Sequence, residues 1–319
     1  MILGIESTAH SFGVGIFGDK VLANVVDMYR PKKGGFVPRQ AADHHVAICK
    51  KVLDEALAKA KVTMEQVDGI AFSAGPGMPP CLRIGAVLAR SLALKYDKSI
   101  IPVNHCVAHI EIGKFATRLH DPVVLYVSGG NTQVLAFTEG RYRTFGEAID
   151  VPLGNAFDQL ARELGVPHPG GLEIEKLAKK GKWIELPYSV KGMDVSFSGI
   201  LTAAINRLKT EKKEDVCFSF QETCFAMLTE VAERAMAHTG KKELLLTGGV
   251  AANSRLQEML GTMTSERSAK FAVVPKEFSG DNGAIIAYCG SLIGKKFSLE
   301  DTKINRYWRS DETVVDWVK

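Results

Sequence analysis

Apolar and polar positions alternate along the chain in two recurring patterns. Short, almost continuous apolar runs bounded by turn residues predict β-strands, and apolar residues spaced three and four apart predict amphipathic helices. In the first part of the chain the predicted strands lie at 2–7, 12–17, 20–29, 69–73 and 100–103, and the predicted helices at 43–61 and 82–96. Thr63 and Gln66 have the spacing of a capping box, which predicts a further helical turn.

The second part of the chain repeats this order. Its predicted strands lie at 123–127, 133–137, 141–148, 243–246 and 270–274, and its predicted helices at 156–164, 172–180, 200–209, 216–238 and 254–263, with a last helix from Asp281. We therefore expect an α/β fold built from a duplicated β-β-β-α-β-α-β-α unit. The first domain would span 1–120 and the second 121–319, with a helical insertion near 165–215. The alternative is one large mixed sheet in which the repeat is accidental.

Composition narrows the class of protein. Of the 319 residues, 46% are hydrophobic and 24% charged, which excludes a disordered chain. No apolar run is long enough for a membrane span, and the first residues lack the basic start of a signal peptide. Six cysteines without a Cys-x-x-Cys pair predict reduced thiols in a cytoplasmic protein. The net charge of +4 permits an anionic partner but does not require one.

Two histidines follow the strand predicted at 100–103. His105 and His109 are four residues apart, so on a helix their imidazoles lie on one face and can reach one metal ion. At the corresponding place in the second half, Asp281 opens a helix. Two histidines and one carboxylate leave coordination positions open, as in non-haem iron(II) sites and some zinc sites. The alternatives are a polar helix start for the histidines and an N-cap for Asp281. No glutamate separates the two histidines, so the general base of a zinc protease is missing.

Three glycine-rich turns lie where predicted strands end, at residues 75–77, 128–132 and 248–253. Glycine lets a backbone approach a ligand closely and point amide groups at anionic oxygens. The chain contains neither a Walker loop nor a Gly-x-Gly-x-x-Gly sequence. Because two of the turns occupy corresponding places in the two halves, we expect a nucleotide between the halves, where ligands of α/β sheets bind. For any single turn the alternative is a turn without a ligand.

Two carboxylates lie at or near predicted helix starts, Asp158 and Glu175. Such groups can accept hydrogen bonds from ribose hydroxyls or from an amine. The alternative, which is favoured for Asp158 taken alone, is capping of a helix.

Together these segments resemble one family. The resemblance is carried by residues 5–10, the histidine pair, and residues 126–132, 154–158, 169–171, 196–199, 219–222, 248–253 and 281–283. From about residue 2 to about residue 309 the chain is similar to the universal tRNA threonylcarbamoyladenosine transferases, once called O-sialoglycoprotein endopeptidases. The sequences around residue 6 and around the histidine pair resemble the archaeal–eukaryotic branch, the catalytic subunit of the KEOPS complex.

The resemblance implies a fold, a reaction and a site. The fold would be that of actin, Hsp70 and sugar kinases, with two RNase-H-like domains around a nucleotide cleft. The reaction would transfer threonylcarbamoyl from threonylcarbamoyl-AMP to N6 of adenosine 37 in tRNAs that read codons beginning with adenine. By resemblance the metal ligands are His105, His109, Tyr126 and Asp281, with iron as the usual metal and zinc as the alternative. The residues matching contacts to the adenine nucleotide are Tyr126, Val127, Ser128, Gly129, Gly130, Asp158, Gly171, Glu175 and Asn253.

The resemblance also implies partners. Besides tRNA, they would be a small protein kinase, a dimerising subunit and a kinase-binding subunit, and in some archaea the kinase is fused at the C-terminus. The net charge is only +4 and we identify no run of basic residues with interleaved aromatic residues, which predicts weak binding of tRNA by this chain alone. Val37 and Gln40 depart from the pattern of the branch, so we assign the loop 34–40 no catalytic role. Ser279 stands where a cysteine is common in the branch, which argues that a thiol at this position is not essential.

Within this hypothesis, catalysis consists mainly of placement and charge stabilisation, with His105, His109 and Asp281 as the catalytic group. No serine or cysteine has a convincing partner base, which favours direct attack by the adenine amine. Two other classes remain open. An actin-like ATPase or sugar kinase would share the fold, although the histidine pair serves no purpose in Mg-ATP chemistry. A non-enzymatic scaffold or nucleic-acid-binding module would fit the scattered lysine pairs.

Overall fold

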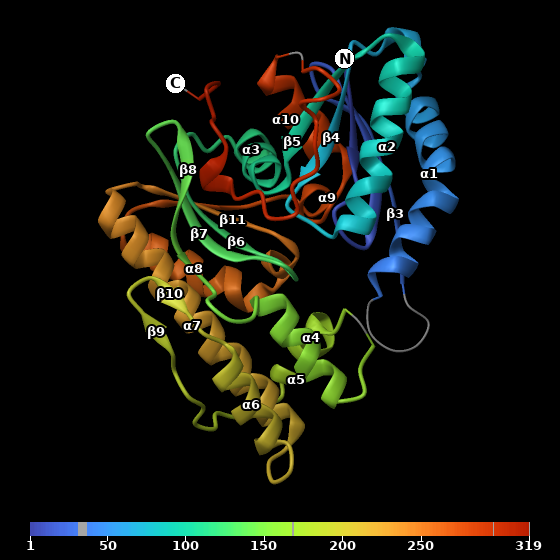
Figure 1. Ribbon diagram of the computed structural model, residues 1–319. Helices are drawn as coiled ribbons and strands as arrows, with labels where there is room; N and C mark the ends of the chain where they lie inside the picture. The colour runs from blue at the N-terminus through green and yellow to red at the C-terminus, as the bar shows by residue number, and fades with distance from the viewer. Residues whose placement is uncertain (31–36, 168, 296, 319) are drawn as a thin grey trace. The chain divides into compact units, whose positions relative to one another are not determined.

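The computed structural model describes residues 1–30, 37–167, 169–295 and 297–318. It divides into two compact units. Unit 1 comprises Met1–Ile112, Glu139–Tyr142 and Gly280–Lys319, and unit 2 comprises Gly113–Thr138 and Arg143–Ser279. Each unit contains one five-stranded sheet flanked by helices (Figure 1). The fold is thus the duplicated RNase-H-like α/β fold that the sequence predicts.

Unit 1 is built on a sheet with the strand order β3-β2-β1-β4-β5. β1, β2 and β3 form an antiparallel meander, whereas β4 and β5 run parallel to β1. Its elements are β1 (Ile2–Glu6), β2 (Ser11–Phe17), β3 (Val21–Met28), α1 (Pro38–Ala60), η1 (Met64–Gln66), β4 (Gly69–Gly75), α2 (Pro79–Tyr96), β5 (Ser99–Asn104), α10 (Gly283–Ile293), η3 (Ser310–Glu312) and the first part of α3 (His105–Thr117). The predicted capping box of Thr63 and Gln66 is present at η1.

Helix α10 explains why the end of the chain belongs to unit 1. A Cβ atom at Gly4 would lie 2.2 Å from the Ala287 nitrogen, and one at Gly15 would lie 2.2 Å from the Ala284 nitrogen. The helix therefore rests directly on the backbone of β1 and β2, which only residues without a side chain permit. The sequence-based boundary at residue 120 groups residues 280–319 with the second half, whereas this close packing groups them with the first.

Unit 2 repeats the plan of unit 1. Its sheet has the order β12-β11-β6-β7-β8, so β6, β7 and β8 correspond to β1, β2 and β3, while β11 and β12 correspond to β4 and β5. Its elements are β6 (Val123–Val127), β7 (Thr132–Thr138), most of β8 (Arg141–Glu147), α4 (Leu153–Glu163), α5 (Gly171–Ala178), β9 (Val190–Lys191), β10 (Asp194–Val195), α6 (Ser198–Arg207), α7 (Lys213–Thr239), β11 (Glu243–Thr247), η2 (Gly249–Ala252), α8 (Ser254–Glu266), β12 (Lys270–Val273) and α9 (Lys276–Ser279).

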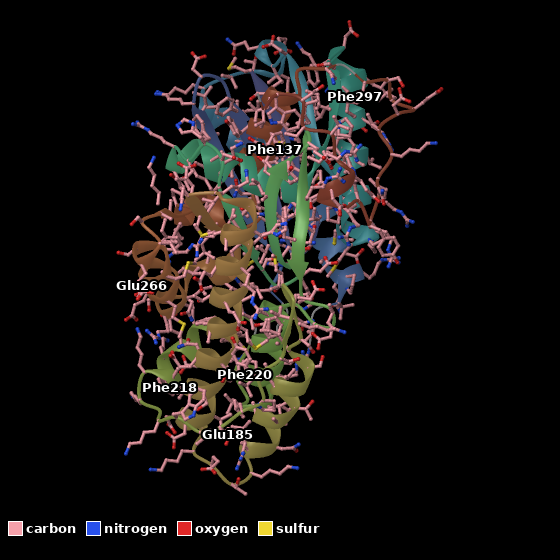
Figure 2. All side chains as sticks on the ribbon, turned by 90° about the vertical axis from the view of Figure 1, so that its left-hand side faces the viewer. Phe137, Glu185, Phe218, Phe220, Glu266 and Phe297 are labelled. Carbon is pink, nitrogen blue, oxygen red and sulfur yellow. The ribbon has the colours of Figure 1, made fainter. Side chains whose placement is uncertain are left out.

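The segment between β8 and α7 has no counterpart among the described residues of unit 1. It contains α4, α5, the small β9–β10 ladder and α6. Its apolar side chains share a core with α7, where the ring of Phe157 lies 5.3 Å from that of Phe220 and 5.7 Å from that of Phe225. Figure 2 shows Phe220 on α7 within this helical part of the unit. Among the described residues, no helix is both long and apolar enough to cross a membrane.

Candidate metal and nucleotide sites

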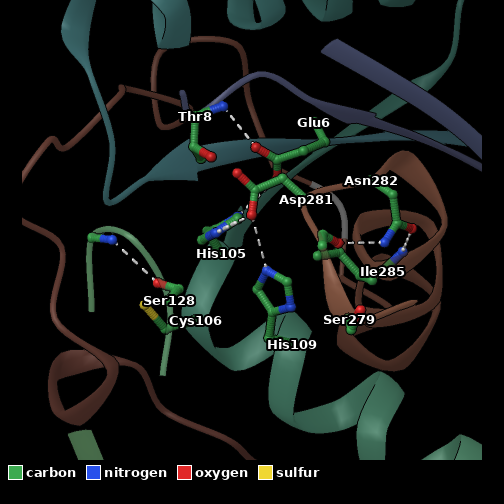
Figure 3. A network of polar contacts seen from close by, with 12 residues as sticks. Glu6, Thr8, His105, Cys106, His109, Ser128, Ser279, Asp281, Asn282 and Ile285 are labelled. Atoms are coloured by element: carbon green, nitrogen blue, oxygen red, sulfur yellow. Dashed lines mark hydrogen bonds and ion pairs between the residues drawn. The ribbon is translucent and has the colours of Figure 1, made fainter. Parts of the chain in front are cut away.

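The histidine pair lies at the start of α3, directly after β5 ends at Asn104. Asn104 caps the helix, because its Oδ1 accepts hydrogen bonds from the amides of Cys106 (3.0 Å) and Val107 (3.2 Å). His105 and His109 then follow one helical turn apart, with ring centroids 4.6 Å apart and planes at 84° (Figure 3). Both side chains are buried. The turn from strand to helix therefore presents two imidazoles at the carboxyl edge of the sheet.

Asp281 completes a group of three in unit 1. Its Oδ1 lies 3.5 Å from Nε2 of His105 and 3.4 Å from Nε2 of His109. The ligand atoms of the three residues lie within 4.8 Å of one another. The alternative interpretation of Asp281 as a helix cap is wrong, because Asn282 caps α10 by accepting from the amides of Ala284 and Ile285. The carboxylate of Asp281 is thereby left to face the histidines (Figure 3).

Glu6 orients the group as a fourth side chain. Its Oε2 lies 2.9 Å from Nδ1 of His105, and its Oε1 accepts a hydrogen bond of 2.6 Å from the amide of Thr8. Glu6 is fully buried at the end of β1. The sequence analysis did not single it out. The sequence feature that could have identified Glu6 is a carboxylate at the end of a buried strand, because a charge in such a position is stable only when it has polar or charged partners.

These contacts shift the acidities of the group. Burial lowers the pKa of His109. Burial acts in the same direction on His105, but the negative charges of Glu6 and Asp281 and their hydrogen bonds outweigh it, so the pKa of His105 lies well above its usual value. For Asp281, burial favours the neutral acid, yet the charge of His105 and hydrogen bonds to both imidazoles hold its pKa well below its usual range. The contacts thus keep the carboxylate of Asp281 ionised beside two buried imidazoles.

The donor set fits a first-row transition metal. Two imidazole nitrogens and one carboxylate oxygen suit iron or zinc better than magnesium, which prefers oxygen ligands. Because Glu6 is bonded to Nδ1 of His105, the other ring nitrogen, Nε2, is the one that faces His109 and Asp281. Histidines that bind a metal in proteins commonly have a carboxylate on the opposite ring nitrogen in this way. Tyr126, the fourth ligand that the resemblance implies, lies buried in β6 of unit 2, and its role as a ligand stays a prediction.

In unit 2 the turn after β6 is closed by Ser128. The Ser128 amide donates to the carbonyl of Asn131 (2.7 Å), and the Ser128 hydroxyl accepts from the amides of Gly130 and Asn131. Val127 precedes the turn in the buried strand. Cβ atoms at Gly129 and Gly130 would meet no heavy atom of the described residues within 4 Å. The turn is therefore ordered by its own hydrogen bonds, and its glycines present an open backbone.

The other predicted nucleotide contacts join helices of unit 2. Asp158 lies inside α4 rather than at its start, so the capping interpretation is wrong, and its Oδ1 accepts from the amide of Gly170 (2.8 Å), next to Gly171. Glu175 lies inside α5 and accepts from the hydroxyl (2.5 Å) and amide of Ser254. Asn253 caps α8 and donates to Gln221 (2.9 Å). These polar groups tie α4 to α5, and α5 to α8.

The turn 75–77 in unit 1 is filled by protein, contrary to the expectation of a ligand loop. A Cβ at Gly75 would lie 1.9 Å from the carbonyl oxygen of Asn305. The amide of Gly77 donates to the carbonyl of Arg306 (3.3 Å), and that of Met78 to the carbonyl of Thr8 (2.8 Å). Its glycines accommodate neighbouring backbone, so the expectation of a ligand at this turn is wrong.

Comparison with known proteins identifies the family. A sequence profile described as tRNA N6-adenosine threonylcarbamoyltransferase matches residues 20–288. This chain belongs to that family. It is 57% identical over 322 residues to the tRNA N6-adenosine threonylcarbamoyltransferase of Thermococcus kodakarensis, covering 99% of each chain. The protein of the same name from Thermofilum pendens is 54% identical, with 99% of this chain and 96% of that one covered.

A further relative of the transferase family is longer. The chain is 54% identical to a probable bifunctional tRNA threonylcarbamoyladenosine biosynthesis protein of Methanosarcina mazei, with all of this chain and 60% of that protein covered. Among solved structures, HypF of T. kodakarensis superposes with a TM-score of 0.67 at 16% identity, covering 94% of this chain and 49% of HypF. The activator of 2-hydroxyisocaproyl-CoA dehydratase from Clostridium difficile superposes at 0.52 and 14% identity, covering 94% of each chain. These two likenesses concern the fold.

The departures from the transferase pattern have ordinary structural roles where they are described. Gln40 lies in the first turns of α1 and its Oε1 accepts from the hydroxyl of Tyr29 (2.5 Å). Val37 directly precedes that helix, and residues 34–36 of the same loop lie outside the described residues. Ser279 ends α9 and donates to the carbonyl of Lys276 (3.0 Å).

Proposed function

We propose that this chain transfers the threonylcarbamoyl group from L-threonylcarbamoyladenylate to N6 of adenosine 37 in tRNA, and that its substrates are tRNAs reading codons that begin with adenine. Membership of the transferase family over nearly the whole chain supports the reaction. The observation that carries the assignment of the site is the convergence of His105, His109 and Asp281. An actin-like ATPase or sugar kinase has no use for that group.

The catalytic centre of the proposal is a metal site. His105, His109 and Asp281 would hold one iron(II) ion, with zinc as the alternative, and Tyr126 from unit 2 would be the fourth ligand. A metal in this place supplies a Lewis acid that polarises the donor's carbonyl or phosphate oxygen. Glu6 would hold the proton on Nδ1 of His105, so that Nε2 is the nitrogen left to bind the metal once the proton on Nε2 is displaced.

The bond changes are those of acyl transfer. The N6 amine of adenosine attacks the carbamoyl carbon, the bond from that carbon to the phosphate oxygen breaks, and AMP leaves with the electron pair. The amine loses one proton, for which we assign no base. Because AMP is a good leaving group and the amine a weak nucleophile, the protein contributes mainly by holding the two reactants in line.

The adenylate would bind along unit 2. We assign its contacts to Tyr126, Val127, Ser128, Gly129, Gly130, Asp158, Gly171, Glu175 and Asn253. Support comes from the open backbone at Gly129, Gly130 and Gly171, where a side chain would meet none of the described residues. The carboxylate of Asp158 accepts from the amide of Gly170, next to Gly171, and that of Glu175 is bonded to Ser254. Both carboxylates can accept hydrogen bonds from ribose hydroxyls.

The proposal includes partners and a location. Besides tRNA, these are a small protein kinase, a dimerising subunit and a kinase-binding subunit, and the complex would act in the cytoplasm. The relative from M. mazei is named as a bifunctional protein of threonylcarbamoyladenosine biosynthesis, and this name supports a partner with a second activity in the same process.

The test is metal analysis combined with an assay for the modified nucleoside. We expect about one tightly bound transition metal per chain, and we expect His105→Ala and His109→Ala to lose both the metal and the activity while circular dichroism stays unchanged. His120→Ala, an exposed histidine, is the matched control. Full modification activity in a metal-free double variant would disprove the role of the site, and hydrolysis of Mg-ATP without acyl transfer would favour the kinase-like alternative.

A further inference from the structure

The C-terminal segment of unit 1 carries a short surface that the function above does not use. We define the C-terminal turn as residues 303–309, Lys-Ile-Asn-Arg-Tyr-Trp-Arg. It contains three cations and two aromatic residues, so it is a short basic run with interleaved aromatic residues, and the expectation that the chain has none is wrong here. Tyr307 is 69% exposed. The guanidinium carbon of Arg306 lies 4.3 Å from the centre of its ring. An aromatic side chain is thus offered to solvent together with a cation.

The turn is held in place by its backbone. The amide of Asn305 donates to the carbonyl of Ala74 (2.8 Å), and the carbonyl of Arg306 accepts from the amide of Gly77 (3.3 Å). Within the turn, the amide of Tyr307 donates to Oδ1 of Asn305 (3.1 Å). Since the two residues before Tyr307 are bonded to the end of β4 and to the turn that follows it, the exposed ring is attached to a fixed backbone, and ordering it on a ligand costs little entropy.

The same turn is joined to the helix that carries the histidine pair. The side-chain amide of Asn104 donates to the carbonyls of Trp308 (3.1 Å) and Arg309 (3.2 Å), while its Oδ1 caps α3. Asn104 directly precedes His105. The turn therefore lies at the carboxyl edge of the sheet of unit 1, the edge at which the proposed metal group lies.

The chemistry of this surface fits an unpaired nucleotide. Single-stranded RNA is recognised by stacking of unstacked bases on exposed aromatic rings and by cations on the phosphates. Arg309 is engaged by Asp311, whereas Arg306 lies over the ring and at the surface. An adenosine in a loop must leave the stack of bases to present its N6 amine, so the neighbouring bases lose a stacking partner. An exposed aromatic ring of the protein can replace that partner.

We propose that the C-terminal turn binds the substrate RNA, with Tyr307 stacking on an unpaired base next to the acceptor adenosine and Arg306 contacting a phosphate. The inference rests on the proposed function, which supplies RNA as the substrate. A protein surface is the competing occupant, and the experiment separates the two.

The experiment uses the chain reconstituted with its partner subunits and an unmodified tRNA transcript whose anticodon loop carries adenosine at position 37. Tyr307→Ala should raise the Kd for the transcript by about five- to tenfold, because one base–aromatic stack is lost. Tyr307→Phe should restore binding, and Arg306→Ala should weaken it and flatten its salt dependence. KM should rise with kcat and metal content unchanged, since stacking contributes equally in the ground and transition states. Trp183→Ala, an aromatic of unit 2 that is 57% exposed, is the control and should bind as wild type.

Two results would overturn the proposal. One is a Kd within twofold of wild type for both Tyr307→Ala and Arg306→Ala in folded protein. The other is loss of assembly with the partner subunits at unchanged RNA affinity, which would make the turn a protein-docking surface. If wild-type protein binds the transcript but leaves it unmodified, the proposed function fails, while the binding comparison still decides the role of the turn.

Discussion

Oε2 of Glu6 lies 2.9 Å from Nδ1 of His105, although 99 positions separate the two residues in the sequence. The last residue of β1 thereby orients the first residue of α3. A carboxylate on Nδ1 fixes both the tautomer and the plane of the ring, so Nε2 faces His109 and Asp281. The sheet of unit 1 thus builds the environment of the group and does not only support its helix.

The first prediction concerns this contact. Glu6→Gln removes the negative charge and lets the side-chain amide compete for Nδ1 as a donor, so His105 can adopt the wrong tautomer. We expect the affinity for the metal to fall about 10- to 100-fold, with little change in the melting temperature. Competition of the protein with a chromophoric chelator measures the affinity.

Glu111→Gln is the matched control for Glu6→Gln. Glu111 is also a buried carboxylate of unit 1 and lies on another part of α3. Its Oε1 accepts from the hydroxyl of Tyr142. Metal affinity close to wild type is expected for this variant. Equal losses in both variants would show that any buried charge in this unit matters, and would contradict a specific role for Glu6.

The second prediction concerns Asn104, which is buried and bonded on both sides. Asn104→Ala removes the cap of α3 and leaves the carbonyls of Trp308 and Arg309 without this donor. A lost cap costs about 1 kcal/mol, and loss of the hydrogen bond to the Trp308 carbonyl adds about 0.5–1.5 kcal/mol, while the Arg309 carbonyl keeps the amide of Glu312 as a donor. We therefore expect unfolding of unit 1 at clearly lower urea concentration. Asn104→Asp keeps the cap and loses only the donor, so it should fall between wild type and Asn104→Ala; an equal loss in both variants would show that the cap is unimportant.

The third prediction separates two adjacent glycines of unit 2. At Gly248, φ is +97° and a Cβ would lie 2.3 Å from the carbonyl oxygen of Val127, so Gly248→Ala should be strongly destabilising. At Gly249 a Cβ would meet none of the described residues within 4 Å, so Gly249→Val should fold. If the adenylate lies along this loop, Gly249→Val weakens its binding at least about tenfold, or about 1.4 kcal/mol. Calorimetry that finds wild-type affinity in folded Gly249→Val would reject this placement.

Local sequence patterns predicted most of the fold. β6 was placed at its observed bounds, 123–127, and α7 was predicted at 216–238 and is observed at Lys213–Thr239. Such segments are recognisable because an apolar run or a helical period records burial on one or both faces. The repeat of these elements predicted two similar units, and the strand order within each sheet comes from the structure. The short β9–β10 ladder was missed, since two-residue strands leave no period to read.

Tertiary contacts explain what the sequence did not reveal. The turn 75–77 looks like a ligand loop, but Asn305, which comes more than 200 positions later, occupies the space that Gly75 opens, and Thr8 occupies the space at Gly77. Asp158 was expected at a helix start because α4 begins three residues earlier than its pattern indicated, at Leu153. The role of Glu6 depends on a partner 99 residues away, and one sequence contains no record of that pairing.

The last prediction concerns acid stability in unit 2. Asp150 accepts hydrogen bonds from the hydroxyl of Ser196 (2.5 Å) and from the amides of Phe197 (3.0 Å) and Ser198 (2.9 Å), so it caps α6 from a distant loop. Burial raises the pKa of Asp150, but these hydrogen bonds and one from the amide of Val151 together outweigh burial, so the pKa lies well below its ordinary value. The unfolded chain, with an ordinary pKa of about 3.9, then binds the proton first. This contribution to stability is complete above about pH 4 and is lost as the pH falls toward the folded pKa.

Asp150→Asn should therefore cost about 1 kcal/mol at pH 7, the value of a helix cap, and progressively less below pH 4. Urea denaturation at pH 7, 3 and 2 measures the difference, with Asp19→Asn, an exposed aspartate of unit 1, as the control. A difference between wild type and Asp150→Asn that stays constant from pH 7 to pH 2 would show that the cap does not depend on the charge.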